Sequence, residues 1–182
     1  MDQQRYSKLI AAKVPADAAR ILSYGKGELP KSFKDTFVAM GKLYAELAEG
    51  VIVLSSEKSC GKTLAACAFL CDPVRCKNPK RFDGQWDANA RPLFFSYLQL
   101  LTTDFKEFYN LTEPGVLVLD DLGAGLPEHA FMKSLIFGIV QQRAHLGLLT
   151  IITTRLEEKE LAKRYGKRFV ELIHTHGRLL TF

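Results

Sequence analysis

The sequence lacks an apolar run long enough to cross a membrane, and it lacks the apolar core of a secretory signal. A spanning helix needs roughly 18 to 20 consecutive apolar residues, and the first residues, MDQQRYSKLIAAK, are mostly charged or polar. Hydrophobic residues make up 47% of the chain and charged residues 25%, which is ordinary for a globular protein. We therefore expect a cytoplasmic protein with no membrane partner.

The sequence also lacks the widely spread cysteines of a disulfide-stabilised secreted protein. Its four cysteines, Cys60, Cys67, Cys71 and Cys76, lie within 17 residues of one another. Zinc sites usually pair their cysteines as CxxC, and these spacings contain no such pair. Buried free thiols are therefore the favoured interpretation, with a zinc site as the alternative.

Short β-branched runs alternate with helical periodicities along the chain, a pattern typical of a parallel sheet covered by helices on both faces. The runs predict strands over residues 51–54, 93–97, 116–119, 149–153 and 179–182. The apolar spacing predicts helices over residues 31–48, 64–71, 98–110, 128–145, 157–165 and 167–174. Residues 5–24 predict a helical lead-in that Pro15 interrupts and Asp17 caps. We expect a lead-in over residues 1–30 and a three-layer α/β core over 31–182, with the ligand beyond the carboxyl ends of the strands.

The decisive motif is the segment SEKSCGKT at residues 56–63, which directly follows a predicted strand and opens a predicted helix. It matches the phosphate-binding pattern G-x-x-x-x-G-K-[ST] at every position except the first, where Ser56 replaces glycine. Gly61 lets the backbone approach phosphates closely, Lys62 is placed for the β- and γ-phosphates, and the Thr63 hydroxyl is placed to bind Mg²⁺. The expected nucleotide-binding residues are Ser56, Glu57, Lys58, Ser59, Cys60, Gly61, Lys62, Thr63 and Leu64.

Polar residues follow two further predicted strands. The run VLVL at 116–119 ends in Asp120 and Asp121; we expect Asp120 to hold Mg²⁺ and Asp121 to orient the attacking water. The fourth strand ends in Thr153, Thr154 and Arg155. Thr154 is the candidate residue for contacting the γ-phosphate or the water, although threonine is also simply a good strand residue.

Together these segments resemble the AAA+ ATPases of the DnaC-type helicase loaders and IstB-type transposition helpers. The resemblance lies in AKVP at 12–15, VLVLDDLG at 116–123, TIITTRL at 150–156 and ELAKRYGKRFVELI at 160–173. VLVLDDLG and TIITTRL resemble the family's Walker B and sensor segments. The resemblance implies a five-stranded parallel P-loop fold with strand order 5-1-4-3-2. It also implies hydrolysis of ATP with Mg²⁺, nucleotide-dependent homo-oligomerisation, and action on DNA together with a replicative helicase or a transposase.

The chain departs from the family pattern at several positions. Arg155 stands where the family usually has a sensor asparagine, and Leu172 where it often has an arginine. An arginine finger acting in trans would then come from Arg168 or, as second choice, Arg143, unless both are ordinary surface residues. The segment between 98 and 116 is too short for the relatives' usual DNA-contacting insert. We expect no lid domain after the fifth strand and no helicase-binding domain of the usual kind before the lead-in.

The segment over residues 72–92 mixes basic residues with aromatic ones, a combination that suits single-stranded nucleic acid through phosphate contacts and stacking. Three aspartates dilute its charge, so a solvated loop whose aromatic side chains fold back on the domain is slightly favoured, and a protein docking site is a further alternative. The net charge of +5 does not decide between them. The residues concerned are Arg75, Lys77, Lys80, Arg81 and Arg91, with Phe82 and Trp86, and Asp72, Asp83 and Asp87.

Three functions therefore remain open from the sequence. The first is an accessory ATPase that places a helicase or transposase on DNA. The second is a nucleotide-gated binding module that hydrolyses ATP slowly, because Arg155 and Ser56 depart from the usual pattern. The third is a P-loop kinase acting on a small molecule, for which the basic residues 163–168 could serve as a lid.

Overall fold

The computed structural model of the chain describes residues 3–25, 27, 29, 32–47, 49–70, 92–102, 108, 110–125 and 128–182. The basic segment expected over 72–92 lies outside the described residues except for Pro92, and so do Cys71 and Cys76. The other two cysteines, Cys60 and Cys67, are buried free thiols. Within these ranges no group of three or more His, Cys, Asp or Glu is arranged to hold a metal.

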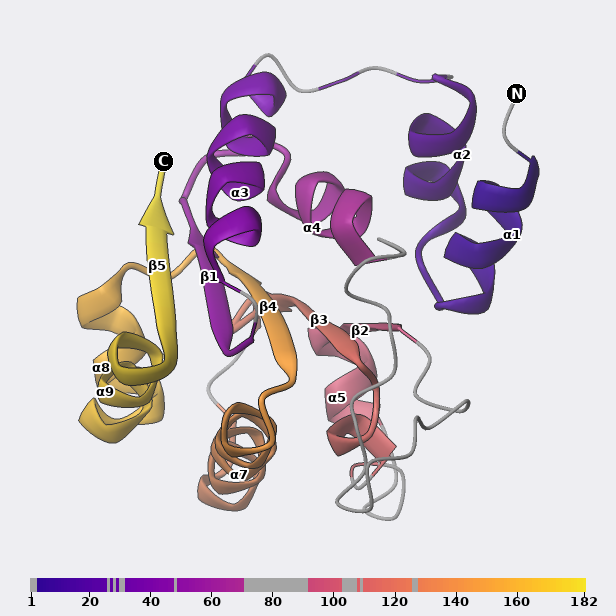
Figure 1. Cartoon of the computed structure of the whole chain (residues 1–182). Helices are drawn as coiled ribbons and strands as arrows, with labels where there is room; N and C mark the ends of the chain where they lie inside the picture. The colour runs from indigo at the N-terminus through magenta and orange to yellow at the C-terminus, as the bar shows by residue number, and fades with distance from the viewer. Residues whose placement is uncertain are drawn as a thin grey trace.

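In the described part of the chain, five strands form one sheet in which every neighbouring pair is parallel. Its order is β2-β3-β4-β1-β5, which is the expected order 5-1-4-3-2 read from the other edge. The fold prediction is therefore confirmed (Figure 1). The strands are β1 (Val51–Ser55), β2 (Leu93–Ser96), β3 (Val116–Leu122), β4 (Leu149–Thr154) and β5 (Gly177–Thr181).

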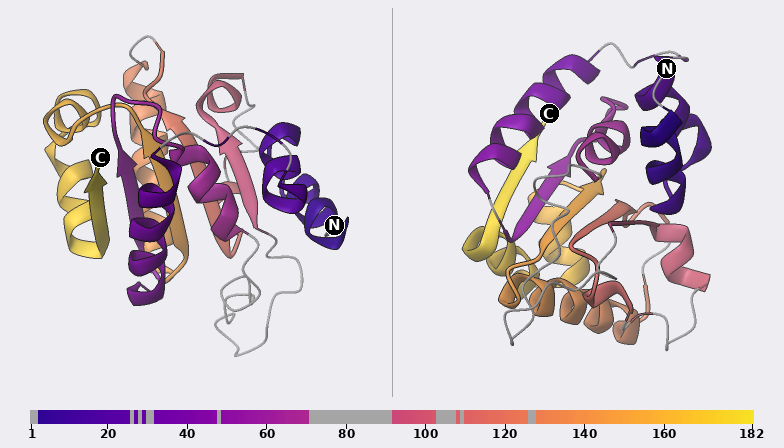
Figure 2. Two further views of the ribbon diagram at one scale, coloured as in Figure 1. Left: turned by 90° about the horizontal axis from the view of Figure 1, so that it is seen from above. Right: turned by 45° about the vertical axis from the view of Figure 1, so that its right-hand side comes forward.

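Helices cover both faces of the sheet and complete the three layers (Figures 1 and 2). One face carries α1 (Gln3–Ala11), α2 (Ala16–Tyr24), α3 (Phe33–Glu46) and α4 (Lys62–Leu70). The other face carries α5 (Tyr97–Thr102), the 3₁₀ turn η1 (Asn110–Thr112), α7 (Ala130–His145), α8 (Glu158–Tyr165) and α9 (Lys167–His176). No helix in the described part of the chain is long and apolar enough to span a membrane.

The strands divide their side chains between two separate cores, because successive residues of a strand point to opposite faces. Ile52 and Leu54 of β1 pack in the core beneath α1–α4. Val51 and Val53 of the same strand pack in the core beneath α7–α9. The same alternation fixes which residue beyond each strand faces α4, and this decides the geometry of the candidate site.

Most element boundaries fall within two residues of the prediction, with three informative differences. β3 continues through Asp120 and Asp121 to Leu122, although these polar residues had predicted its end. The helix expected over 98–110 is described only over Tyr97–Thr102, and Asn110 begins a 3₁₀ turn. Asp17 does not cap α2: Pro15 is the N-cap residue, and Asp17 lies in the first turn, 3.7 Å from Arg20.

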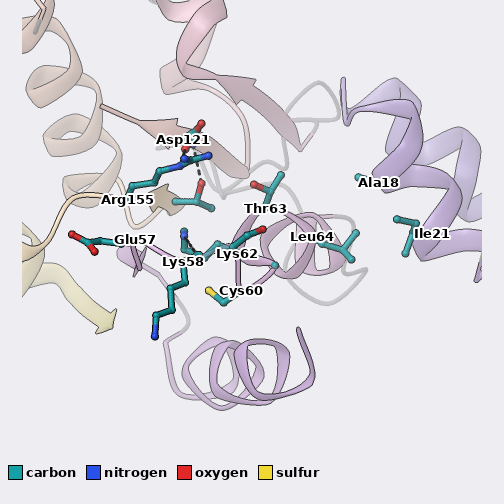
Figure 3. A pocket seen from close by; sticks show the side chains of 13 residues that line it. Ala18, Ile21, Glu57, Lys58, Cys60, Lys62, Thr63, Leu64, Asp121 and Arg155 are labelled. Carbon is teal, nitrogen blue, oxygen red and sulfur yellow. Dashed lines mark hydrogen bonds and ion pairs between the residues drawn. The ribbon is translucent and has the colours of Figure 1, made fainter. Parts of the chain in front are cut away.

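The N-terminal lead-in packs on the same core as the sheet. Leu9 and Ala19 are 1% and 0% exposed, and both belong to the cluster that contains Ile52. The amide of Phe94 in edge strand β2 donates a 2.8 Å hydrogen bond to the carbonyl of Ala12. The α1–α2 hairpin is thus built onto the edge of the sheet, and α2 stands beside the amino end of α4 (Figure 3).

Candidate functional site

The carboxyl ends of β1, β3 and β4 meet at one edge of the sheet and border a cavity of about 370 Å³. Residues 57–64, the loop after β1 and the start of α4, form its floor, and Asp121, Thr153 and Arg155 face it from the other two strands. Ala18 and Ile21 of α2 line a further side (Figure 3). A cavity of this size accommodates a ligand as large as a nucleotide.

The loop after β1 is held in a closed turn. The amide of Ser56 donates to the Thr154 carbonyl at 3.2 Å, and the Ser56 hydroxyl accepts from the Lys58 amide at 3.1 Å. Gly61 adopts φ 83°, a left-handed conformation that favours glycine. From α3, the Thr36 hydroxyl donates to the Cys60 carbonyl at 2.8 Å. Ser56 is 3% exposed and lies behind the loop, so it shapes the turn and does not line the cavity.

The Lys62 ammonium is turned toward this loop. It donates to the carbonyl of Ser56 at 2.7 Å and to the carbonyl of Lys58 at 3.2 Å, and the residue is 8% exposed. Burial lowers the pKa of Lys62, because a charged group is less well solvated there than in water. An anion in the cavity would give this cation an oppositely charged partner, so the lysine fits a phosphate group.

Asp120 lies deeper, at 9% exposure, on the face of β3 that carries α4. The Thr153 hydroxyl donates to its Oδ1 at 2.7 Å. Burial raises the pKa of Asp120, while hydrogen bonding to Thr153 and Thr63 works in the opposite direction. A carboxylate beside the Thr63 hydroxyl supplies the hard oxygen donors that Mg²⁺ prefers, so these two residues fit the expected metal.

Asp121 faces the cavity because β3 is irregular at this point. The pairing with β4 shifts register between Leu119 and Leu122, and Asp121 has φ 56°. Its amide donates to the Thr153 hydroxyl at 2.8 Å. Its carboxylate Oδ1 lies 3.7 Å from Nε of Arg155. The irregularity therefore brings two adjacent carboxylates to the same site, whereas regular strand alternation would send them to opposite faces.

The structure does not bring Thr154 to the cavity. Its hydroxyl donates to the Leu122 carbonyl at 2.7 Å and accepts from the Leu156 amide at 3.1 Å, and the residue is fully buried. Thr154 shares its strand face with Ile152, beneath α7–α9. Thr153 shares the opposite face with Ile151, beneath α4, and occupies the place that was expected of Thr154.

The turn that follows Asp121 is fixed by a buried polar network. Arg164 of α8 donates to the Gly123 carbonyl at 2.7 Å and to the Glu128 carboxylate at 2.8 Å. Tyr165 donates a short hydrogen bond to the same carboxylate. The Glu128 side chain is fully buried, and burial by itself raises its pKa. The hydrogen bonds from Arg164 and Tyr165 outweigh this effect, so the pKa of Glu128 is lowered overall. The network holds the segment after β3 against α8 without using a residue of the cavity.

The arginines expected to act in trans differ in position. Arg143 is fully buried and donates to the Thr150 hydroxyl at 2.9 Å and to the carbonyls of Pro114 and Leu149 at 2.6 and 2.7 Å. Its interpretation as a finger residue is therefore wrong, because it cannot reach a neighbouring molecule. Arg168 is exposed at the start of α9 and does not line the cavity. Leu172 is 8% exposed and packs in the core.

Sequence reasoning missed three features of the site. Ala18 and Ile21 carry no chemical signal, and only the folding back of α2 brings them to the cavity. Arg155 was treated as a defect of the pattern, yet it lines the cavity and pairs with Asp121. Thr153 was not distinguished from Thr154, because strand alternation places the two residues on opposite faces of the sheet but does not say which face carries α4.

No protein-family model and no curated protein matches this sequence, but solved structures share its fold. The DnaC helicase loader is 22% identical, with a TM-score of 0.59 over 87% of this chain and 94% of that one. DnaI is 18% identical, with a TM-score of 0.62 over 92% and 94%. The replication initiator DnaA bound to AMPPCP and single-stranded DNA is 15% identical, with a TM-score of 0.56 over 86% and 47%. The chain therefore shares the three-layer α/β fold of the DnaC helicase loader and of DnaI, which is the fold that its motifs predicted.

Proposed function

We propose that this protein is a Mg²⁺-dependent ATPase of the DnaC-type AAA+ group that helps load or regulate a helicase or transposase on DNA. One observation carries the proposal: the turn at the amino end of α4 faces the same cavity as Asp121 and Thr153, and Asp120 lies directly behind Thr153, hydrogen-bonded to its hydroxyl. This arrangement offers amide groups and a lysine for phosphates, oxygen donors for Mg²⁺ and a carboxylate for water.

Each residue has a distinct role in this proposal. The amides of residues 57–63 and the Lys62 ammonium bind the phosphates, while Ser56 closes the turn from behind. Thr63 and Asp120 hold Mg²⁺, which neutralises charge that develops on the phosphates. Asp121 orients the attacking water, and Thr153 positions the Asp120 carboxylate and the backbone of Asp121. Leu64 with Ala18 and Ile21 lines the apolar side of the cavity.

The proposed partners follow from proteins of the same fold. One of them is described as a helicase loader, and another was solved with an ATP analogue and single-stranded DNA. We propose that this chain also assembles with copies of itself when ATP is bound and acts on DNA, single-stranded DNA being favoured. Arg168, exposed at the start of α9, is the candidate to reach a neighbouring copy's nucleotide.

The enzymatic claim is tested by ATP turnover measured without DNA, with single-stranded DNA and with double-stranded DNA. Lys62→Ala should abolish both nucleotide binding and turnover, because the variant loses the cation that faces the loop. Lys159→Ala, a change of the same kind at an exposed position of α8, should behave as wild type. Absence of hydrolysis by the wild type under all three conditions would remove the claim that the protein is an ATPase.

Assembly is tested by measuring the mass of the protein in solution with and without a non-hydrolysable ATP analogue and DNA. A larger mass in the presence of the analogue supports a nucleotide-dependent oligomer. The mass of Lys62→Ala should be the same with and without the ATP analogue and DNA. Growth of that variant to the same size as wild type would show that assembly does not depend on the proposed phosphate site.

A second function, a nucleotide-gated binding module with little hydrolysis, is favoured by the pairing of Asp121 with Arg155. A carboxylate engaged by a cation is a weaker acceptor for a proton from water. Nucleotide affinity measured beside turnover separates the two functions. Fast turnover by the wild type that is lost in Asp121→Asn would rule out the second one.

A further inference from the structure

We propose that Arg155 distinguishes ATP from ADP by exchanging its partner, the Asp121 carboxylate, for the terminal phosphate of a bound triphosphate. This inference rests on the proposed nucleotide site and adds a specificity-determining residue to it. Arg155 stands where the resembling family usually has an asparagine. In this proposal its guanidinium contacts the γ-phosphate of the nucleotide bound to the same chain.

The position of Arg155 is the first argument. It follows the last residue of β4, and its side chain reaches over the cavity toward Asp121 (Figure 3). The distance from Nε of Arg155 to Oδ1 of Asp121 is 3.7 Å. Both residues line the cavity that the phosphate-binding turn borders. An anion that extends from this turn toward Asp121 therefore meets the guanidinium.

The weakness of the ion pair is the second argument. The Arg155 side chain is 70% exposed and that of Asp121 is 43% exposed. An ion pair with this much solvent contact is weakly held, and a separation of 3.7 Å is longer than a charge-assisted hydrogen bond. A terminal phosphate carries more charge than one carboxylate, and its oxygens match the planar fork of a guanidinium. Exchange of one partner for the other is therefore favourable.

The charges around the cavity are the third argument. Lys62 enters from α4 and Arg155 from the end of β4, and both residues line the cavity. Two cations that converge on one cavity repel each other unless an anion lies between them. A triphosphate carries more negative charge than a diphosphate, so in this proposal Arg155 supplies positive charge beyond that of Lys62 for the third phosphate.

The test compares the dissociation constants of a non-hydrolysable ATP analogue and of ADP, both with Mg²⁺. Arg155→Ala should weaken binding of the ATP analogue about tenfold or more, the size expected for a lost charge-assisted contact, and leave ADP within about twofold of wild type. The affinity of Arg155→Lys for the ATP analogue should lie between that of wild type and that of Arg155→Ala. Arg178→Ala, at the amino end of β5 and away from the cavity, is the matched control and should bind both nucleotides as wild type.

The carboxylate partner gives a second test with the opposite sign. Asp121→Asn removes the competitor for Arg155, so the ATP analogue should bind more tightly than to wild type, with ADP unchanged. This gain should vanish in the double variant Asp121→Asn with Arg155→Ala. Because the pair is exposed, the gain should also shrink as salt is added.

The outcomes separate this inference from the function on which it rests. If the wild type binds neither nucleotide, both the proposed function and the role of Arg155 are overturned. If the wild type binds both and Arg155→Ala weakens both equally or neither, the nucleotide site stands and the role of Arg155 is overturned. Thermal unfolding of each variant shows whether a loss of binding reflects a loss of folded protein.

Discussion

The hydroxyl of Thr153 donates a 2.7 Å hydrogen bond to the carboxylate of Asp120. The same hydroxyl accepts a 2.8 Å hydrogen bond from the amide of Asp121. A single side chain on β4 therefore fixes the two adjacent acidic residues of β3 where the register between the strands shifts. Because its single proton is donated to Asp120 and a lone pair accepts from Asp121, the Thr153 hydroxyl has a defined orientation in the site.

We predict that Thr153→Val impairs Mg²⁺-dependent nucleotide binding, because valine keeps the shape but neither donates nor accepts. The variant should need more Mg²⁺ for half-maximal binding and lose about 1–2 kcal/mol of unfolding free energy, as expected for a buried group left unpaired. Thr154→Val is the matched control, since its hydroxyl bonds Leu122 and Leu156 on the other face. It should lose similar stability but keep the Mg²⁺ dependence; equal Mg²⁺ effects in both variants would contradict the assignment.

We predict a pH dependence of stability that arises from Asp120. Burial raises its pKa above the ordinary value of 3.8, so the folded protein holds this proton more tightly than the unfolded chain. The resulting stabilisation is fully present below the unfolded pKa and is lost as the pH rises through the folded pKa. Asp120→Asn does not lose this stability as the pH rises, because an asparagine does not ionise. Its stability relative to wild type, measured by urea unfolding without Mg²⁺, should therefore increase from about pH 4 to about pH 7.

The same Asp120→Asn variant should bind Mg²⁺–nucleotide poorly, because an amide is a weaker ligand for Mg²⁺ than a carboxylate. A stability difference between variant and wild type that is constant over this pH range would show that burial does not penalise the carboxylate. Addition of Mg²⁺ and ATP analogue should stabilise the wild type and not the variant.

We predict that Arg143 contributes to stability and not to catalysis. Burial lowers the pKa of Arg143 to about 9, so the guanidinium stays charged at neutral pH, held by backbone carbonyls and Thr150. Arg143→Met should cost about 2–4 kcal/mol of unfolding free energy, because several buried acceptors lose their donor. Gln142→Met, at the exposed neighbouring position of α7, is the control. A drop in turnover by Arg143→Met with unchanged stability would contradict this role.

The sequence predicted the sheet because each strand is a compact apolar run bounded by polar residues. It predicted the phosphate turn because a local motif of this kind requires a strand before it and a helix after it. The end of β3 was misplaced, since polar Asp120 and Asp121 continue the strand. That continuation depends on pairing with β4, which no local pattern contains.

Two side-chain assignments failed for a related reason. From the sequence, Arg143 was expected to be at the surface. In the structure, carbonyl groups of residues 111–114 and of the start of β4 surround it. Thr154 and Thr153 are chemically identical in the sequence, and only the position of α4 on one face of the sheet separates them. Burial by distant segments and the choice of face are tertiary properties, so composition and periodicity cannot supply them.

The hydrogen bond from Phe94 to Ala12 has a consequence for the outer edge of the sheet. Among the described strands, β2 is the last on its side, and a free edge strand offers its backbone as a template on which another chain can add a strand. The segment before α2 already engages this backbone, and it covers the edge with the α1–α2 hairpin. By covering β2, the lead-in therefore also hinders aggregation of the protein through strand addition at this edge of the sheet.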